Sequence, residues 1–219
     1  MKQLLVFLAL ILPIFADDSK PTTSVSDKRS MEFSAEGVVR IVYSFGELTI
    51  EGWDQPAVEL TKTRFSFAGR EMKPGDASAG ILTMAREGNA VVITLGREHH
   101  GIFHPTPDGD DVDREYSIKV PRAARLDIDH DHGEVNITGV TGDIRAVSRY
   151  GPILLRLPAE GHYAIDADCR FGTVYSDFAG DAHRRHLFGE SFASRSEARQ
   201  KLDLKVGMGD IMILKMNGR

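Results

Sequence analysis

The sequence predicts an all-β protein of stacked strands, of the β-solenoid or β-roll type, with a less regular N-terminal part. Three observations favour this class. A short motif recurs, in which a glycine follows an aromatic, His or Met residue and precedes one variable residue and then a β-branched residue or leucine. Alternating apolar and polar residues flank the copies, as in half-buried strands. Helical patterns are nearly absent, because segment 194–201 has too few apolar residues to pack a helical face and reads as an exposed loop.

The motif copies explain why the strands should stack. Five copies are centred on Gly46, Gly133, Gly151, Gly172 and Gly209, and a sixth, preceded by Thr, on Gly142. Glycine between strands permits a positive φ or a close approach of two backbones. A nine-residue unit buries about three apolar side chains, worth roughly 1.5–3 kcal/mol each. Ordering its backbone costs roughly 1–2 kcal/mol per residue, which is more. Units with a coil period of about 18–21 residues must therefore share one core.

The N-terminal residues carry the features of a secretion signal. Lys2 provides a positive start, residues 4–12 are apolar, and Ala16 precedes acidic residues. The apolar run is shorter than the roughly 20 residues that span a bilayer. We therefore expect a signal peptide over residues 1–16, a flexible polar leader over 17–31 and a single domain over 32–219. No later stretch is apolar enough to cross a membrane, so the mature protein is expected to be periplasmic or extracellular.

Strands are expected in two groups. The N-terminal group is less regular, with two intervening loops at 65–80 and 96–113, and Pro121 closes its final strand. Its predicted strands are 38–45, 47–51, 57–67, 81–85, 90–95 and 115–120. From Leu126 onward the repeat is regular, and the glycine spacing sets the strands.

Charge and cysteine content exclude some functions. The net charge of −5 becomes −6 when Lys2 leaves with the signal, and acidic and basic residues are interspersed. A nucleic acid partner is excluded because phosphate binding needs a basic field. With one cysteine, no intrachain disulfide can form. Cys169 alternates with charged residues on the apolar face of a strand, which predicts a buried, unreactive thiol.

Three segments resemble those of a known family. They are Ile50-Glu51-Gly52-Trp53-Asp54, then Val58-Glu59-Leu60, and later Tyr116-Ser117-Ile118-Lys119-Val120-Pro121. Together with the glycine repeats, their order resembles the bacterial exported "putative adhesin" domain family over about residues 32–216. The resemblance implies a β-solenoid-like fold and an adhesive role, with no catalytic residues to carry over. Pro152 and the segment 161–169 depart from the family pattern. Trp53 is expected to pack a corner with its indole hydrogen-bonded.

Histidine clusters raise the alternative of a periplasmic metal-binding protein. His99, His100 and His104 share one predicted loop, and His130 and His132 lie two residues apart on a strand. Imidazole and carboxylate ligands suit zinc, nickel or copper. Nothing in the sequence brings the two clusters together, so no metal site is assigned. His183 and His186 lie among arginines and read as solvated surface. The acids at 108, 110, 111 and 113 lack the spacing of a calcium loop.

Carboxylates on one strand raise a second alternative, an enzyme acting on polysaccharide. Asp127, Asp129 and Asp131 should project from one face, with Glu134 beyond the next turn. Outward charges on strands more often aid solubility or block edge pairing. No acid–base pair and no serine nucleophile elbow is identifiable. The preferred interpretation is a non-catalytic scaffold of the cell envelope without a cofactor. Its partner would be an envelope protein, a glycan or another copy of itself, and its binding residues are unassigned.

Overall fold

The chain folds entirely into β-strands over the residues that the structure, a computed structural model, describes. These residues are 23–34, 36–66, 81–96, 112–184, 188–195 and 198–216, and they contain seventeen strands and no helix. The strands are β1 Thr23–Glu32, β2 Val38–Phe45, β3 Glu47–Trp53, β4 Ala57–Ser66, β5 Ile81–Glu87, β6 Ala90–Gly96, β7 Val112–Pro121, β8 Arg125–His132, β9 Val135–Thr138, β10 Ile144–Tyr150, β11 Ile153–Pro158, β12 Tyr163–Phe171, β13 Val174–Ser176, β14 Asp181–Arg184, β15 Glu190–Arg195, β16 Gln200–Met208 and β17 Ile211–Met216. The predicted all-β class is confirmed.

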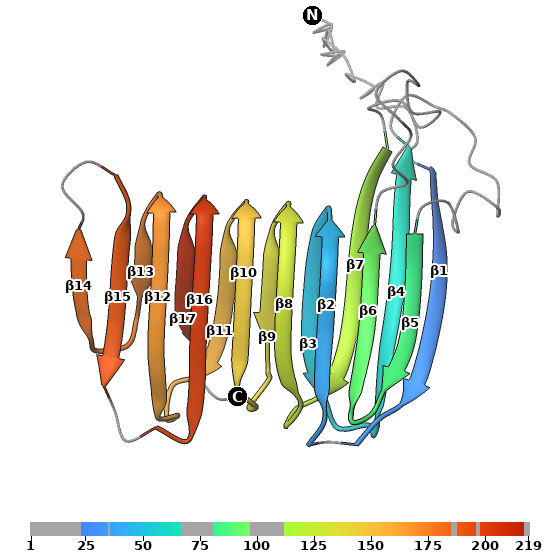
Figure 1. Cartoon of the computed structure of the whole chain (residues 1–219), viewed down its shortest axis with the longest axis horizontal. Helices are drawn as coiled ribbons and strands as arrows, with labels where there is room; N and C mark the ends of the chain where they lie inside the picture. Colours follow the sequence, from blue (N-terminus) through green and yellow to red (C-terminus); the bar gives the residue numbers. More distant parts are fainter. Residues whose placement is uncertain are drawn as a thin grey trace, which may run out of the picture.

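Two mixed sheets face each other along the length of the molecule (Figure 1). Sheet A has eight strands in the order β1-β4-β7-β3-β9-β11-β17-β13. Sheet B has nine, in the order β14-β15-β12-β16-β10-β8-β2-β6-β5. The central strands pair in parallel, whereas antiparallel strands flank them in sheet B at both ends and in sheet A at the β1 end.

Successive strands cross from sheet B to sheet A at corners that contain the motif glycines. The glycine corners at the ends of β2, β8, β10, β16 and β12 lie side by side in that order along the upper edge in Figure 1. Gly151 adopts a φ of 119°, and a β-carbon added there would overlap the carbonyl oxygen of Gly133 on the next corner. Only glycine allows this backbone approach. Five of the six motif glycines are therefore in register, whereas Gly142, between β9 and β10, lies against the carbonyl oxygen of Ala124 instead.

The strand pairs do not stack in the order in which the chain makes them. β16 pairs with β10 on one side and with β12 on the other, so the last described pair, β16–β17, lies between β10–β11 and β12–β13. A coil that climbs steadily along the sequence would place β12 next to β10. The solenoid or β-roll assignment thus stays a prediction beyond the confirmed all-β class.

The core lies between the sheets in rows that run along the stack. In sheet B, Ile41, Ile128, Ala146, Leu204 and Ala167 are in register on neighbouring strands and are buried. A matching buried row crosses sheet A through Ile118, Ile50, Ile137, Leu155 and Ile213. Because each unit contributes one side chain to each row, the burial of every side chain depends on its neighbours.

Two local predictions are wrong. Residues 23–31 were expected to belong to a flexible leader, but Thr23–Glu32 forms β1 and pairs along its full length with β4. Ladder hydrogen bonds order this polar segment without an apolar pattern of its own. The loop expected at 194–201 is also shorter, because β15 extends to Arg195 and β16 begins at Gln200. The buried side chain of Gln200 donates to the carbonyl oxygen of Gly142 at 2.5 Å.

The signal peptide predicted over residues 1–16 lies outside the described residues. Among the residues described, no helix is long and apolar enough to pass through a bilayer.

Candidate functional site

A continuous row of side chains borders the glycine corners along one edge of the stack. We call it the corner strip. It comprises the residues that precede the five corner glycines, in the spatial order Phe45, His132, Tyr150, Met208 and Phe171, and in addition Phe188, which lies just before β15. Strand register pairs each of the first four residues with the next, and the ring centroid of Phe188 lies 5.5 Å from that of Phe171. The strip is one side chain wide and crosses five neighbouring strands, with Phe188 at its end.

The strip combines internal stacking with unusual exposure. The His132 ring stacks between Phe45 and Tyr150, with centroids 4.6 and 4.5 Å away. Within the described part of the chain, five large apolar side chains are exposed, and four of them belong to the strip: Tyr150, Phe171, Met208 and Phe188. Their exposed fractions run from 42% to 66%. A contiguous apolar patch rimmed by polar groups is typical of an interaction surface.

A row of arginines and glycines follows the strip on the outer face of sheet B. We call it the arginine row, and it consists of Arg149, Gly207, Arg170 and Gly189, one residue from Tyr150, Met208, Phe171 and Phe188 respectively. Gly207 lies in register between the two arginines, and Gly189 lies against the carbonyl oxygen of Arg170 at 2.5 Å from an added β-carbon. The exposed side chain of Arg170 has no ion pair or hydrogen bond to another described residue.

A shared carboxylate links the two rows. Asp131 accepts from Arg149 at 2.9 Å through one oxygen, and its other oxygen lies 3.1 Å from Nδ1 of His132. The side chain of Arg149 is 70% exposed despite this pair. The arginine at this end is therefore held in place beside the strip while its guanidinium stays open to solvent.

The predicted carboxylates share a face as expected, but arginines bind them. Asp127 accepts from Arg145 at 2.7 Å and from Arg40 at 3.1 Å, and Asp129 accepts from Arg145 at 3.1 Å. The same pairs raise the pKa of Arg145, chiefly through its hydrogen bond to Asp127. Glu134 lies beyond the corner and accepts from Asn136 instead. All three aspartates on the outer face of β8 are therefore paired with arginines.

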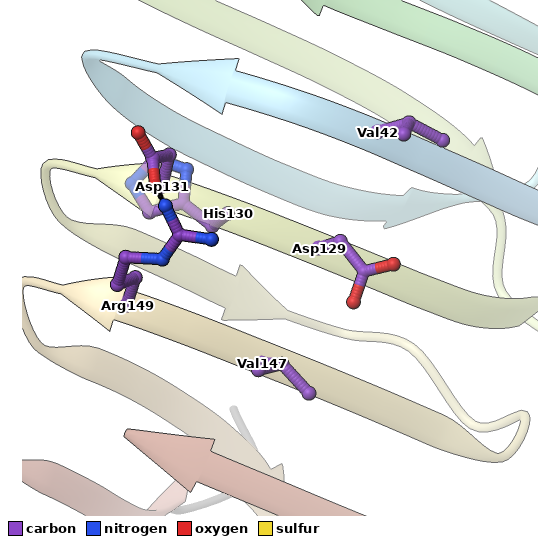
Figure 2. A pocket seen from close by; sticks show the side chains of 6 residues that line it. All are labelled: Val42, Asp129, His130, Asp131, Val147 and Arg149. Carbon is purple, nitrogen blue, oxygen red and sulfur yellow. Dashed lines mark ion pairs between the residues drawn. The ribbon is translucent and has the colours of Figure 1, made fainter. Parts of the chain in front are cut away.

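A shallow hollow of about 240 Å³ opens on this face between β2, β8 and β10 (Figure 2). Val42, Asp129, His130, Asp131, Val147 and Arg149 line it. Figure 2 shows the Arg149–Asp131 ion pair at one end of the hollow and Asp129 apart from it. The hollow is smaller than a typical small-molecule pocket of 300–1,000 Å³ and adjoins the arginine row.

The two strand histidines occupy different environments. His130 is 4% exposed, and its Nδ1 lies 2.6 Å from the hydroxyl of Ser44 within the core. His132 stands in the corner strip. Across the described residues, no group of three or more His, Cys, Asp or Glu could hold a metal ion. His99, His100, His104, His186 and the acids at 108, 110 and 111 fall outside those residues. His183 is exposed in β14, in agreement with the prediction.

The burial of His130 predicts a pH-dependent stability. Burial lowers the pKa of His130, against smaller opposing effects of the Gly133 backbone and Asp131. Below about pH 6.5 the unfolded chain binds a proton here that the folded chain does not, so stability falls as pH falls. We expect urea unfolding between pH 7.5 and 5.5 to show this loss, with a slope of at most about 1.4 kcal/mol per pH unit. His130→Gln should flatten the slope and His162→Gln, at an exposed position, should not. Equal slopes in all three proteins would contradict the prediction.

Two further sequence predictions are confirmed. Cys169 is fully buried, its thiol donates to the carbonyl oxygen of Gly209, and burial raises its pKa to about 11. Such a thiol is a poor nucleophile. Trp53 packs at a corner and donates its indole N–H to the carbonyl oxygen of Ala57 at 2.8 Å.

Comparisons with known proteins give only distant structural likenesses. No family model and no curated protein matches the chain. A crystal structure named "putative cell adhesion protein", from Clostridium sporogenes, is 10% identical and covers 87% of this chain and 100% of its own, with a TM-score of 0.49. A "putative adhesin" from Bacteroides fragilis is 9% identical over 86% of this chain and 97% of its own, with a TM-score of 0.28. Another from Parabacteroides merdae is 7% identical over 69% and 68%, with a TM-score of 0.25.

These neighbours bear the adhesin names of the family that the sequence resembles. At such identities and TM-scores they assign neither family membership nor a ligand, and the family resemblance stays a prediction.

The corner strip has a signal in the sequence. The residue before most motif glycines is aromatic, His or Met, and this regularity is the strip itself. The arginine row had no comparable signal. Arg149 and Arg170 belong to motif copies that are adjacent in sequence, yet β16 separates them in space.

Proposed function

We propose that the protein is an exported, non-catalytic, adhesin-like binding protein of the cell envelope, with a β-solenoid-like stack as its scaffold. The corner strip is its contact surface. The single observation that supports this role is the gathering of Tyr150, Met208, Phe171 and Phe188 in one exposed row. Leaving such a row in water is unfavourable by roughly 25 cal/mol for each Å² of apolar area. Covering it with a partner recovers that free energy.

A catalytic role has less support. Arginines bind all three carboxylates of β8, and the hollow beside them is small. A purified protein that turned over a glycan or an ester, and lost this turnover in Asp129→Asn, would contradict the non-catalytic proposal.

The contact surface can be tested with cell envelopes. We expect the purified mature protein to co-sediment with washed bacterial envelopes, and the triple variant Tyr150→Ser, Met208→Ser, Phe171→Ser to bind at least tenfold more weakly. Anchor side chains of an interface each contribute more than about 1 kcal/mol, and 1.4 kcal/mol is tenfold in affinity.

The matched control is Tyr175→Ser. Tyr175 is 56% exposed but lies on the outer face of sheet A, away from the strip. Thermal melting should show both variants folded, since exposed substitutions change stability little. Unchanged envelope binding by the triple variant, or equal loss in the control, would overturn the assignment of the strip.

A further inference from the structure

The corner strip and the arginine row lie side by side and form an edge with an apolar side and a cationic side. The strip supplies apolar surface, and the row supplies two guanidinium groups that flank bare backbone at Gly207. Along the stack the arginines are two strands apart, or about 10 Å from Cα to Cα, given a strand spacing of 4.7–4.9 Å. The glycine leaves that space free of side chains.

We propose that this edge binds a linear acidic polysaccharide, a chain of pyranoses that carry carboxylate groups, laid along the stack. This rests on the proposed function and names its ligand class. Arg149 and Arg170 pair with the carboxylates, and the C–H faces of the sugar rings lie on Tyr150, Met208 and Phe171. Arginine suits this task because its planar fork matches a carboxylate with two parallel hydrogen bonds.

Three of the nearby acids have partners other than Arg170. Asp131 is paired with Arg149, Asp210 accepts from the backbone and hydroxyl of Thr173, and Glu190 accepts from the backbone of Val174. Arg170 has no such partner among the described residues. The exposed guanidinium of Arg170 is therefore open to a carboxylate of a ligand.

The shape of the edge favours a polymer over a lipid surface. The strip is a single line of side chains, whereas a bilayer presents a plane. Acidic residues Glu47, Glu134 and Asp210 follow three of the corner glycines and would face an anionic membrane across the strip. A linear chain can follow the line and keep its charges on the arginine side.

The test uses polygalacturonate oligomers as the acidic probe, with neutral cello-oligomers of equal length as the control. We expect calorimetry with the full-length mature protein to show binding of the acidic probe only, weakening with added salt. Arg170→Gln should reduce affinity about tenfold, because it removes a charge-assisted hydrogen bond to a carboxylate of the ligand. Arg149→Gln should have a similar effect. Arg156→Gln, which changes an arginine on sheet A, is the matched control and should leave affinity unchanged.

The outcomes separate this inference from the proposed function. No binding of the acidic probe, or equal binding by Arg170→Gln, overturns the inference. Binding instead to vesicles of phosphatidylglycerol and phosphatidylcholine, or concentration-dependent dimers lost in Phe171→Ser, also overturns it by identifying another occupant. If the triple strip variant loses envelope binding while both arginine variants retain it, the proposed function stands and the ligand class is wrong. If the strip variant keeps envelope binding, the proposed function itself fails.

Discussion

Gly151→Ala is expected to lower the free energy of unfolding by about 3 kcal/mol or more. Two costs combine. Gly151 has a φ of 119°, where a side chain is strained, and the new β-carbon would overlap the carbonyl oxygen of Gly133. The new β-carbon would meet backbone atoms and not a flexible side chain, so the overlap can be relieved only if β8 and β10 move apart. Urea unfolding of the variant and the parent protein gives the difference directly.

Gly88→Ala is the matched control. Gly88 has a φ of 62° in the turn between β5 and β6, and an added β-carbon there meets nothing within 4 Å. Only the conformational cost remains, about 1 kcal/mol. Equal losses in both variants would show that stacking of the corners contributes nothing to the strain at Gly151.

Lys62→Met is expected to raise the free energy of unfolding by about 3 kcal/mol at pH 7. Lys62 lies on the core side of β4 and is 1% exposed. Its pKa is lowered to about 8, chiefly by burial and also by repulsion from Arg64 and Arg114. Since the unfolded pKa is about 10.4, the folded state disfavours the charged form, and each pKa unit corresponds to 1.36 kcal/mol. Methionine fills a similar volume without a charge.

The sign of the pH dependence gives a second measurement on the same residue. Between about pH 8 and 10.4 the unfolded chain binds the proton of Lys62 and the folded chain releases it, so stability rises with pH. Unfolding by urea at pH 7, 8, 9 and 9.7 should show this rise in the parent and a flatter profile in Lys62→Met. Lys28→Met, which removes an exposed lysine of β1, should keep the rise. A parent profile that is flat or falls over this range would refute the prediction.

The sequence alone predicts which side chains face the core and where the corners lie. It does not predict which strands become neighbours in the sheets. The alternation around Ile137, Cys169 and Leu204 fixes which side chains face inward, because period 2 admits only two choices. The motif glycines likewise identify the corners. Whether β12 or β16 lies beside β10 depends on which of two similar apolar strands fits better, and a local pattern does not distinguish them.

The structure of the polar segments could not be predicted from the sequence for a related reason. β1 has no apolar alternation, and its order comes from pairing with β4, which only the fold reveals. Lys62 and Arg64 continue the inward face of Val58 and Leu60, but charged side chains at inward positions read as exposed when partners are unknown. The corner strip was visible in sequence as residue types, and its exposure was not.

The position of β16–β17 between two earlier strand pairs has a consequence for how the protein is made. On the ribosome, β12 and β13 emerge without the neighbour that will cover their inner edge. The 40 residues that follow Ser176 up to Met216 take roughly 2–8 s to synthesise. During that time β10 and β12 each present an open parallel edge, which favours binding by holdase chaperones. For the exported role proposed above, the late synthesis of β16–β17 would delay tight folding until after translocation.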